Sequence, residues 1–317
     1  MEDNMCITLY AAPLQGYTEA AWRNAHEQVF GGIDAYYTPF VRLEKGDMRN
    51  KDKREISIAE NRVRHLVPQL VASIPDELRF LAGRIAEAGY KEIDLNMGCP
   101  FPMIANRGKG AGILPYPERV KALLDAMSAM PEISFSVKMR LGWQDAEEWR
   151  AVLPLLNDSC VERIVLHPRI GKQQYKGEVD QSQFAAFYAE CQKPLVYNGD
   201  LCTSEQISRL MDGFPSLQGV MLGRGLLANP ALATEFRTRT PLLKSVLYNK
   251  VYEMHQSVYE QYAHTLEGGE AQLLSKLKTA WEYLLPDMEK KRRKAILKAN
   301  RLEVYLQAVR VALTCPA

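Results

Sequence analysis

The sequence lacks the cysteine patterns of disulfide-rich and zinc-binding proteins. Its cysteines are scattered through 317 residues, with no CxxC pair and no group of cysteine and histidine at the spacing of metal ligands. They are Cys6, Cys99, Cys160, Cys191, Cys202 and Cys315. We expect all of them to be reduced thiols, with no disulfide and no bound metal.

Long apolar runs are absent as well. No window approaches the roughly 20 consecutive apolar residues that a membrane-spanning helix needs. The N-terminal residues MEDN are acidic, whereas the start of a signal peptide is basic. These features favour a cytoplasmic protein without a membrane partner.

Neither sign of charge is in excess, since 40 Lys and Arg stand against 38 Asp and Glu. Net charge therefore does not identify a nucleic-acid partner. The basic residues are concentrated near the C-terminus, where the run MEKKRRK (288–294) is followed by Lys298 and Arg301.

What the sequence does contain is an alternation of short apolar runs with longer segments of helical period. The eight runs are CITLYAAP, DAYYTPF, LVPQLVAS, EIDLNMG, FSVKMRL, RIVLHPR, PLVYNGD and GVMLGRG. Segments of helical period, such as 76–88, 117–130 and 204–211, separate most of them. Eight βα units within about 240 residues predict an α/β protein built on a closed (β/α)8 TIM barrel.

The strand pattern ends after Pro230, and residues 242–312 have helical period with two breaks, at 267–270 and 284–287. Pro241 cannot continue the helix before it. We predict a barrel over residues 1–241 and a separate all-helical domain over residues 242–317.

Polar or conformationally special residues stand at the C-terminal end of every predicted strand. In a barrel these ends meet on one face, where barrel enzymes carry their active sites. Capping of loops is the common role of a lone Asn or Asp, but recurrence at eight strand ends favours a shared site. The residues are Pro13, Gln15, Thr38, Gln69, Asn96, Cys99, Lys138, Arg140, His167, Asn198, Asp200, Gly223 and Arg224.

The last two strand ends carry the glycine loops YNGD and LGRGLL. Exposed backbone N–H groups in such loops bind phosphate, and the loops after strands seven and eight are the usual phosphate site of barrels. Arg224 would add a charged donor. The pair of loops favours a ligand that carries phosphate over two tight turns.

Lys138 and His167 point to the same end of the barrel. A lysine there would stabilise the negative charge of a reduced flavin or form an aldolase-type Schiff base. A structural pair with Asp94 is the third interpretation. Burying a lysine in an otherwise apolar strand is costly, which favours a functional role.

Cys99 lies in EIDLNMGCP, in a Gly-Cys-Pro turn at a strand end. A free thiol has a pKa of roughly 8.5, so it is protonated at pH 7 and can act as a general acid. The common alternative is a buried, inert cysteine, which we expect for the other five cysteines.

These motifs resemble those of the tRNA-dihydrouridine synthases. LYAAPLQGYT, LVPQLVAS, DLNMGCP followed by GKGAGIL, SVKMRLGW, HPRIGKQQYKG, NGD and GRG occur in the order of that family and cover the whole barrel. The resemblance implies an FMN enzyme reduced by NADPH or NADH. It implies that hydride passes to C6 of a uridine in the tRNA D-loop and that a cysteine gives a proton to C5.

Carried over residue by residue, the resemblance makes Cys99 the proton donor and places Asn96 and Arg140 against the uracil, with Arg169 as a further substrate-binding residue. The residues that would hold FMN are Pro13, Leu14, Gln15, Gln69, Lys138, His167, Asn198, Gly199, Asp200, Gly223 and Arg224.

The sequence departs from the family pattern at HPRI, where His-Gly-Arg-Thr is usual. Pro168 removes a backbone donor and Ile170 a hydroxyl. TPFVRL and SVKMRLGW resemble the bacterial C-type enzymes, which modify the uridine at tRNA position 16.

The resemblance implies a role for the basic residues near the C-terminus, in the run 288–294. Lys291, Arg292 and Arg293 would bind tRNA phosphates without reading sequence, although a solvated helix face is an equal alternative for each side chain. A monomer suits a protein that wraps an extended RNA.

Three alternative functions stay open at this point. The first is an FMN-dependent barrel oxidoreductase acting on a free small molecule, and the second is an aldolase or isomerase using Lys138. The third is a non-catalytic tRNA-binding protein, which the altered HPRI loop leaves open.

Overall fold

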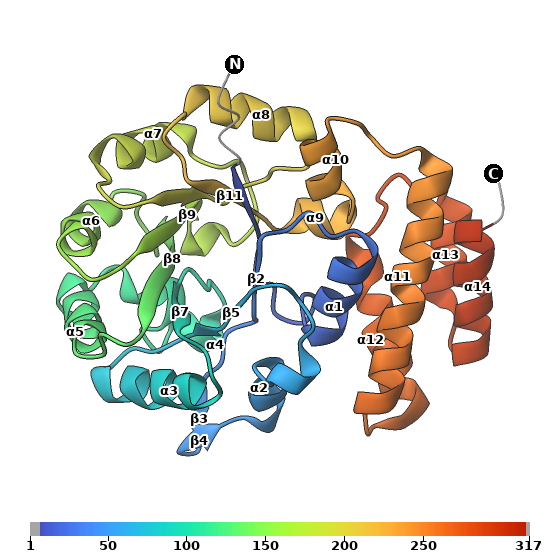
Figure 1. The fold of residues 1–317 in the computed structure, drawn as a ribbon, viewed down its shortest axis with the longest axis horizontal. Coiled ribbons are helices and arrows are strands. Elements are labelled where there is room, and N and C mark those ends of the chain that lie inside the picture. The colour runs from blue at the N-terminus through green and yellow to red at the C-terminus, as the bar shows by residue number, and fades with distance from the viewer. Residues whose placement is uncertain (1–6, 315–317) are drawn as a thin grey trace.

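The computed structural model describes residues 7–314, in which parallel strands surround a common axis (Figure 1). All eight predicted strand positions are confirmed. The barrel strands are β1 (Thr8–Ala11), β2 (Ala35–Tyr37), β5 (Leu66–Val67), β6 (Gln69–Leu70), β7 (Glu92–Met97), β8 (Ser134–Gly142), β9 (Arg163–Ile170), β10 (Leu195–Tyr197) and β11 (Gly219–Leu222).

The sheet closes through β5 and β6, which are two halves of one predicted strand. The order is β5-β2-β1-β11-β10-β9-β8-β7-β6, with β5 paired to β2 and β6 paired to β7. Only Pro68 separates the two halves, and it interrupts the ladder because proline has no N–H. Its carbonyl still accepts a hydrogen bond from Asp94 N at 2.9 Å. The predicted TIM barrel is therefore confirmed.

Helices cover the outside of the barrel (Figure 1). Three of them, α3, α4 and α5, begin with proline, whose fixed φ and missing N–H suit the first helical turn. The helices from α1 to α10 are α1 (Ala20–Val29), α2 (Asn50–Glu55), α3 (Pro75–Glu87), α4 (Pro102–Ala105), α5 (Pro117–Ser128), α6 (Trp149–Asn157), α7 (Gln181–Glu190), α8 (Ser204–Gly213), α9 (Arg224–Ala228) and α10 (Leu232–Thr238). The sequence did not indicate α2 or the hairpin of β3 (Leu43–Glu44) and β4 (Asp47–Met48).

Side chains of the barrel strands alternate between two environments. In β8, Phe135, Val137 and Met139 are buried in the main hydrophobic cluster between the strands and the helices. The intervening residues, Ser136 and Lys138, point to the barrel interior, because successive side chains of a strand face opposite sides. The polar residues of the strands thus share the inside of the barrel.

The C-terminal helices have a hydrophobic cluster of their own, which includes Trp281, Ile296 and Tyr305. They are α11 (Lys244–Thr265), α12 (Gly269–Thr279), α13 (Lys290–Lys298) and α14 (Leu302–Thr314). The helical character and the predicted breaks at 267–270 and 284–287 are confirmed. The predicted number of breaks is wrong, because the described helices have one more. A third break separates α13 from α14, where Ala299 has extended backbone and its carbonyl accepts a hydrogen bond from Lys278. The domain division at residue 241 stays a prediction.

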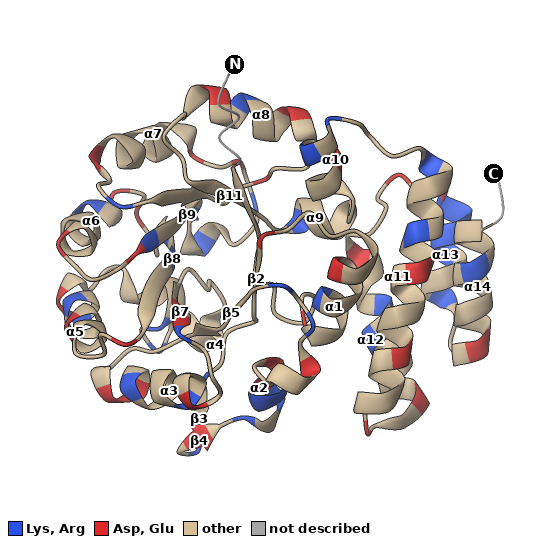
Figure 2. Cartoon of the chain, viewed as in Figure 1, with Lys and Arg blue, Asp and Glu red and all other residues tan. Residues whose placement is uncertain are grey.

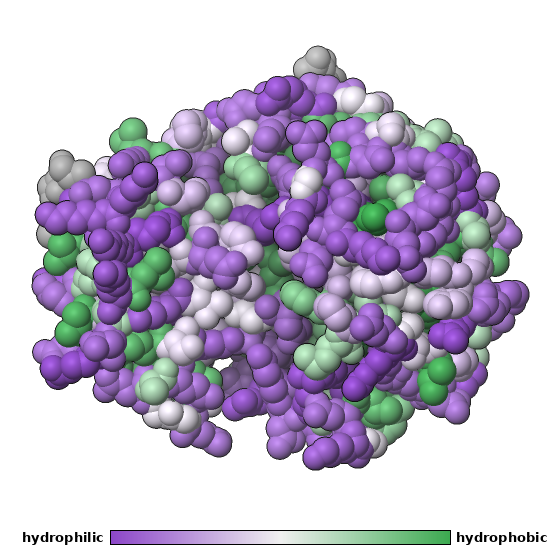
Figure 3. All heavy atoms as spheres, turned by 180° about the vertical axis from the view of Figure 1, so that it is seen from behind, coloured by the Kyte–Doolittle hydropathy of each residue, from purple (hydrophilic) through white to green (hydrophobic). Residues whose placement is uncertain are grey.

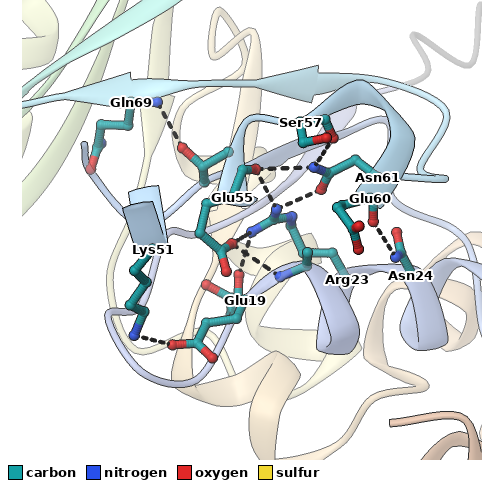
Figure 4. A network of polar contacts seen from close by, with 12 residues as sticks. Glu19, Arg23, Asn24, Lys51, Glu55, Ser57, Glu60, Asn61 and Gln69 are labelled. Carbon is teal, nitrogen blue, oxygen red and sulfur yellow. Dashed lines mark hydrogen bonds and ion pairs between the residues drawn. The ribbon is translucent and has the colours of Figure 1, made fainter. Parts of the chain in front are cut away.

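A buried polar network links the barrel to these helices (Figure 4). Arg23, fully buried on α1, donates to Glu55 and to Asn61. Glu19 pairs with Lys51 at 2.5 Å and, on its other oxygen, with Lys276 of α12 at 2.7 Å. These lysines hold the pKa of Glu19 below its ordinary value, although burial acts to raise it. The network fixes the helical region against α1 and α2.

Charged residues are spread over the described surface, and several Lys and Arg lie on α13 and α14 (Figure 2). Seen from behind the view of Figure 1, apolar side chains occur in small scattered groups between hydrophilic ones (Figure 3). Within residues 7–314, no helix has the length and apolar character that crossing a membrane requires.

Candidate functional site

The polar residues inside the barrel form successive layers along its axis. In the parallel register, Gln69 stands beside Asp94, and Asp94 beside Ser136. The next layer pairs Asn96 with Lys138. The layer after it pairs Arg140 with His167 and lies at the C-terminal ends of the strands.

The turn after β7 carries Cys99 into the mouth of the barrel. Asn96 Oδ1 accepts hydrogen bonds from Gly98 N at 3.0 Å and from Cys99 N at 2.8 Å. The Cys99 carbonyl accepts from Ala111 N at 3.0 Å. A Cβ on Gly110, whose φ is +57°, would lie 2.7 Å from that carbonyl oxygen, so only glycine fits there.

Burial raises the pKa of the Cys99 thiol above its ordinary value, although the charges of Arg140 and Lys138 act in the opposite direction. The side chain is 7% exposed. Cys99 therefore holds its proton at neutral pH.

The side-chain ammonium of Lys138 forms no hydrogen bond and no ion pair with any residue in the described range 7–314. Asp94, the partner considered from the sequence, instead accepts hydrogen bonds from Gln69 and Ser136, each at 2.7 Å. Burial lowers the pKa of the Lys138 ammonium to about 8, and the charge of Arg140 acts in the same direction. The site thus holds a half-buried cation at the pocket wall that is not neutralised by direct contact.

His167 is held from behind by Arg169, which donates to its Nε2 at 3.1 Å. Arg169 is almost fully buried and forms an ion pair with Asp200. Asp200 also pairs with Arg224 at 2.5 Å, so one carboxylate lies between two guanidinium groups. This end of the site keeps an excess of positive charge.

Pro168 lies in an irregularity of β9. Arg140 pairs with His167 and Gly142 pairs with Ile170, so β9 has one residue more than β8 over this stretch. A proline is tolerated at such a bulge because the missing N–H costs no ladder hydrogen bond. Ile170 continues the strand, and its carbonyl accepts from Arg140 Nη1 at 3.0 Å.

A pocket of about 480 Å³ opens at this end of the barrel. Most residues predicted from the strand ends line it, which brings together segments from the first to the last strand. The predicted residues that line the pocket are Pro13, Leu14, Gln15, Asn96, Cys99, Lys138, Arg140, His167, Asn198, Gly199, Asp200, Gly223 and Arg224.

A model of the family described as "Dihydrouridine synthase (Dus)" matches residues 10–311, which is nearly the whole chain. This chain belongs to the dihydrouridine synthase family.

Relatives in this family have low but extended similarity. A probable tRNA-dihydrouridine synthase of Staphylococcus epidermidis is 27% identical over 277 residues, covering 83% of this chain and 82% of the relative. One of Treponema pallidum is 32% identical over 258 residues, covering 77% and 73%. The tRNA-dihydrouridine synthase B of Pasteurella multocida is 25% identical over 268 residues, covering 78% and 77%.

Solved structures show the same fold. Morphinone reductase superposes with a TM-score of 0.52 at 12% identity, covering 76% of this chain and 88% of that one. Histamine dehydrogenase from Rhizobium sp. 4-9 gives a TM-score of 0.52 at 13% identity, covering 78% and 48%.

Five residues named from the dihydrouridine synthase resemblance do not line the pocket. Gln69 is fully buried beneath it, and Arg169 lies behind His167. The other three, on α13, are Lys291, Arg292 and Arg293. Lys291 is exposed, whereas Arg292 and Arg293 are half-buried.

Arg293 binds backbone within its own chain. Its guanidinium donates to the carbonyl oxygens of Trp281, Leu284 and Leu285. Leu285 has a left-handed φ of +48°, and its N–H donates to Ala228 of α9 at 3.0 Å. Arg293 thus stabilises the segment 281–286, which joins the helical region to the barrel.

Sequence reasoning missed two parts of the site. Tyr175 lines the pocket, and its ring lies near the guanidinium groups of Arg140 and Arg224, at 5.5 and 4.9 Å from the centroid. Its position in the motif QQYKG was the available signal. The helical region also contributes Glu282, Tyr283 and Pro286 to the wall, for which no local signal exists.

Two cysteine expectations need correction. Cys160 and Cys202 are exposed and Cys191 is half-buried, so the expectation of buried, inert cysteines is wrong for the first two. Cys160 lies in the loop after α6 and Cys202 in the loop after β10. All four described cysteines are free thiols, and Cys6 and Cys315 lie outside the described residues.

Proposed function

We propose that this protein reduces a uridine in the D-loop of tRNA to dihydrouridine, with FMN that NADPH or NADH has reduced. The observation that carries the proposal is the protonated Cys99 thiol beside the unpaired Lys138 ammonium, in one pocket of a dihydrouridine synthase family member.

The pocket fits a flavin mononucleotide. Its volume of about 480 Å³ lies within the range of ligand sites, about 300–1,000 Å³. Gln15 Oε1 is buried without a hydrogen-bond partner in the described structure, and Lys138 lacks one as well. A buried polar atom without a partner, such as this Gln15 oxygen, is costly unless a ligand satisfies it. FMN bound there would supply hydride to C6 of the uracil.

Arg224 and the two glycine loops would hold the phosphate of FMN. Gly199 and Gly223 both line the pocket, and Arg224 stands beside them. The excess of positive charge around Asp200 favours an anion at this end of the site. Lys138 would stand by the ring system, where a cation stabilises the negative charge that reduction creates.

Cys99 would deliver the proton to C5 of the uracil. A general acid must hold its proton at the working pH and stand within hydrogen-bond reach of the accepting atom. Burial satisfies the first condition, and the Gly-Cys-Pro turn faces the pocket. Asn96 and Arg140 line the same pocket and would contact the uracil.

The tRNA would lie across the barrel mouth and the helical region. Lys290, Lys291 and Lys294 of α13 are exposed and can contact phosphates. The segment that supplies Glu282 and Tyr283 to the pocket connects this helix with the site. The target uridine must leave its stack to reach the pocket, which costs a few kcal/mol, and phosphate contacts offset that cost.

The motifs TPFVRL and SVKMRLGW support assignment to the C-type enzymes and to the uridine at position 16. A monomer and a cytoplasmic location suit a tRNA substrate, and both stay predictions.

The test is reduction of tRNA that lacks dihydrouridine. We expect purified protein to be yellow, to release FMN on denaturation, and to form dihydrouridine at one D-loop position with NADPH. Cys99→Ala should keep the flavin and its reduction by NADPH, but lower the rate of dihydrouridine formation by about 10²- to 10⁴-fold. Full activity of this variant would remove Cys99 from the mechanism.

A preparation that cannot be loaded with FMN would contradict the flavin proposal. Reduction of free uracil compounds but not of tRNA would favour the oxidoreductase acting on small molecules. tRNA binding without any reduction would favour the non-catalytic alternative.

A further inference from the structure

A continuous line of buried hydrogen bonds runs from Asp94 to the backbone of Cys99. Gln69 Nε2 donates to Asp94 Oδ2 at 2.7 Å. Asn96 Nδ2 donates to Gln69 Oε1 at 2.7 Å. Asn96 Oδ1 then accepts from the N–H groups of Gly98 and Cys99. Asp94 and Gln69 are fully buried, and Asn96 is 8% exposed.

The carboxylate of Asp94 determines the direction of every bond in this line. An ionised carboxylate only accepts hydrogen bonds, so Gln69 must present its amide nitrogen to Asp94 and its amide oxygen to Asn96. Asn96 must then present its nitrogen to Gln69, which leaves its oxygen for the turn. Burial raises the pKa of Asp94 to about 6, so the carboxyl group is still ionised at neutral pH.

The oxygen of Asn96 is what fixes the turn. Backbone N–H groups are donors only, so the amide nitrogen of Asn96 in place of its oxygen would leave both without an acceptor, and the N–H of Cys99 is buried. The N–H of Cys99 is one of the two, and a shift of this turn moves the thiol. A misplacement of about 1 Å at a reacting group can cost about 100-fold in rate.

We propose that Asp94 is a positioning residue for Cys99, acting through the amide groups of Gln69 and Asn96. The role rests on the proposed function, in which Cys99 is the proton donor. Gln69, named from the family resemblance as an FMN ligand, gains a part in holding the thiol. Asn96 can contact uracil at the same time, because only one of its two amide hydrogens is donated to Gln69.

The test moves the negative charge from residue 94 to residue 96. This exchange reverses the donor and acceptor roles along the line of hydrogen bonds. In Asn96→Asp the new carboxylate still accepts from the turn, but its other oxygen faces Gln69 Oε1. The side-chain amide of Gln69 must flip in order to donate to the new carboxylate, and the flip places its oxygen next to the Asp94 carboxylate. We expect a loss of about 100-fold in the single-turnover rate of tRNA reduction.

Asp94→Asn alone should be mild. Its amide oxygen accepts from Gln69, and its nitrogen donates to the Ser136 hydroxyl, which can rotate to accept. We expect a loss of less than about tenfold.

The double variant Asp94→Asn with Asn96→Asp restores a consistent line in the opposite direction. Gln69 then donates to residue 96 and accepts from residue 94. We expect the single-turnover rate of the double variant to be at least about tenfold higher than that of Asn96→Asp. A double variant whose loss equals the product of the two single losses would overturn the proposal, and would make Asn96 a substrate contact only.

A second readout does not depend on tRNA. The alkylation rate of Cys99 by iodoacetamide, followed by peptide mass spectrometry, should change in Asn96→Asp and return toward the wild-type rate in the double variant. The exposed Cys160, which does not line the pocket, serves as the internal reference, because its rate should be the same in all four proteins. Equal Cys99 rates in all four would also overturn the proposal.

The two readouts separate this proposal from the proposed function. Wild-type protein that forms no dihydrouridine would contradict the function, while the alkylation rates would still report how Asp94 acts on Cys99. Flavin content and thermal unfolding of each variant show whether the barrel is intact.

Discussion

Arg169 donates a hydrogen bond from Nη1 to Nε2 of His167 at 3.1 Å. A guanidinium group has no acceptor, so Nε2 must carry the lone pair, and the hydrogen of the neutral ring is on Nδ1. Burial, together with the charges of Arg140 and Lys138, holds the pKa of His167 well below its ordinary value. His167 therefore offers the pocket a neutral N–H donor whose orientation Arg169 fixes.

We expect His167 to stay neutral from about pH 5 to 8, as followed by NMR of protein labelled with ¹⁵N-histidine. Arg169→Leu removes one neighbouring cation and should raise the pKa of His167 toward the ordinary value. His65 is the control in the same spectra. Its pKa is raised by the hydrogen bond with Glu92, so it should titrate in this range in both proteins. Wild-type His167 titrating near pH 6.5 would contradict the tautomer assignment.

The lowered pKa of Lys138 predicts a loss of activity in alkaline solution. Its pKa of about 8 means that the positive charge is present below that pH and is lost as pH rises through it. We expect the single-turnover rate of tRNA reduction to fall above about pH 8, by up to roughly tenfold per unit. Lys138→Met should be slow at pH 7 and show no change near pH 8. A wild-type profile as flat as that of the variant would exclude this role.

The exposed lysines of α13 predict salt-dependent binding of tRNA. Reversing the charge of Lys290, Lys291 and Lys294 to Glu should weaken binding, and the slope of log affinity against log salt should fall by roughly one for each phosphate contact removed. Oxidation of NADPH without tRNA should be unchanged. Lys121→Glu on α5, on the opposite side of the barrel (Figure 1), is the matched control. An unchanged slope in the triple variant would show that α13 does not touch phosphate.

The hydrogen bonds of Arg293 predict that its substitution lowers the stability of the protein. From the sequence alone, this residue was expected to contact phosphate. Arg293→Met leaves the carbonyl groups of Trp281, Leu284 and Leu285 without their charged donor. We expect the free energy of unfolding in urea to fall by about 2–3 kcal/mol. Lys294→Met on the same helix is exposed and should change it by less than about 0.5 kcal/mol. Equal stability of the two variants would mean that Arg293 does not hold the pocket wall.

The two arginines of α13 show that the sequence alone does not predict which way a side chain of a helix points. A run such as KKRRK predicts positive charge on a helix, but the direction of each side chain depends on which face the neighbouring helices cover. Ile296 is buried against the other helices, and this places Arg292 and Arg293 toward the protein and Lys290, Lys291 and Lys294 toward solvent. The same limit applies to Glu282 and Tyr283, which reach the pocket only because the helical region packs against the barrel.

The sequence by itself determined the strands, their inward residues and the turn that carries Cys99. The alternation of a strand has a period of two, and the effects of glycine and proline are local, so both can be found in a few consecutive residues. The tertiary structure alone decided which inward groups meet. Asp94 and Asn96 come from β7 and Gln69 from β6, and Arg169 of β9 reaches Asp200 in the loop after β10. Their partners depend on the register between strands and on the direction in which each amide group must point, which are properties of the closed barrel and not of any short segment.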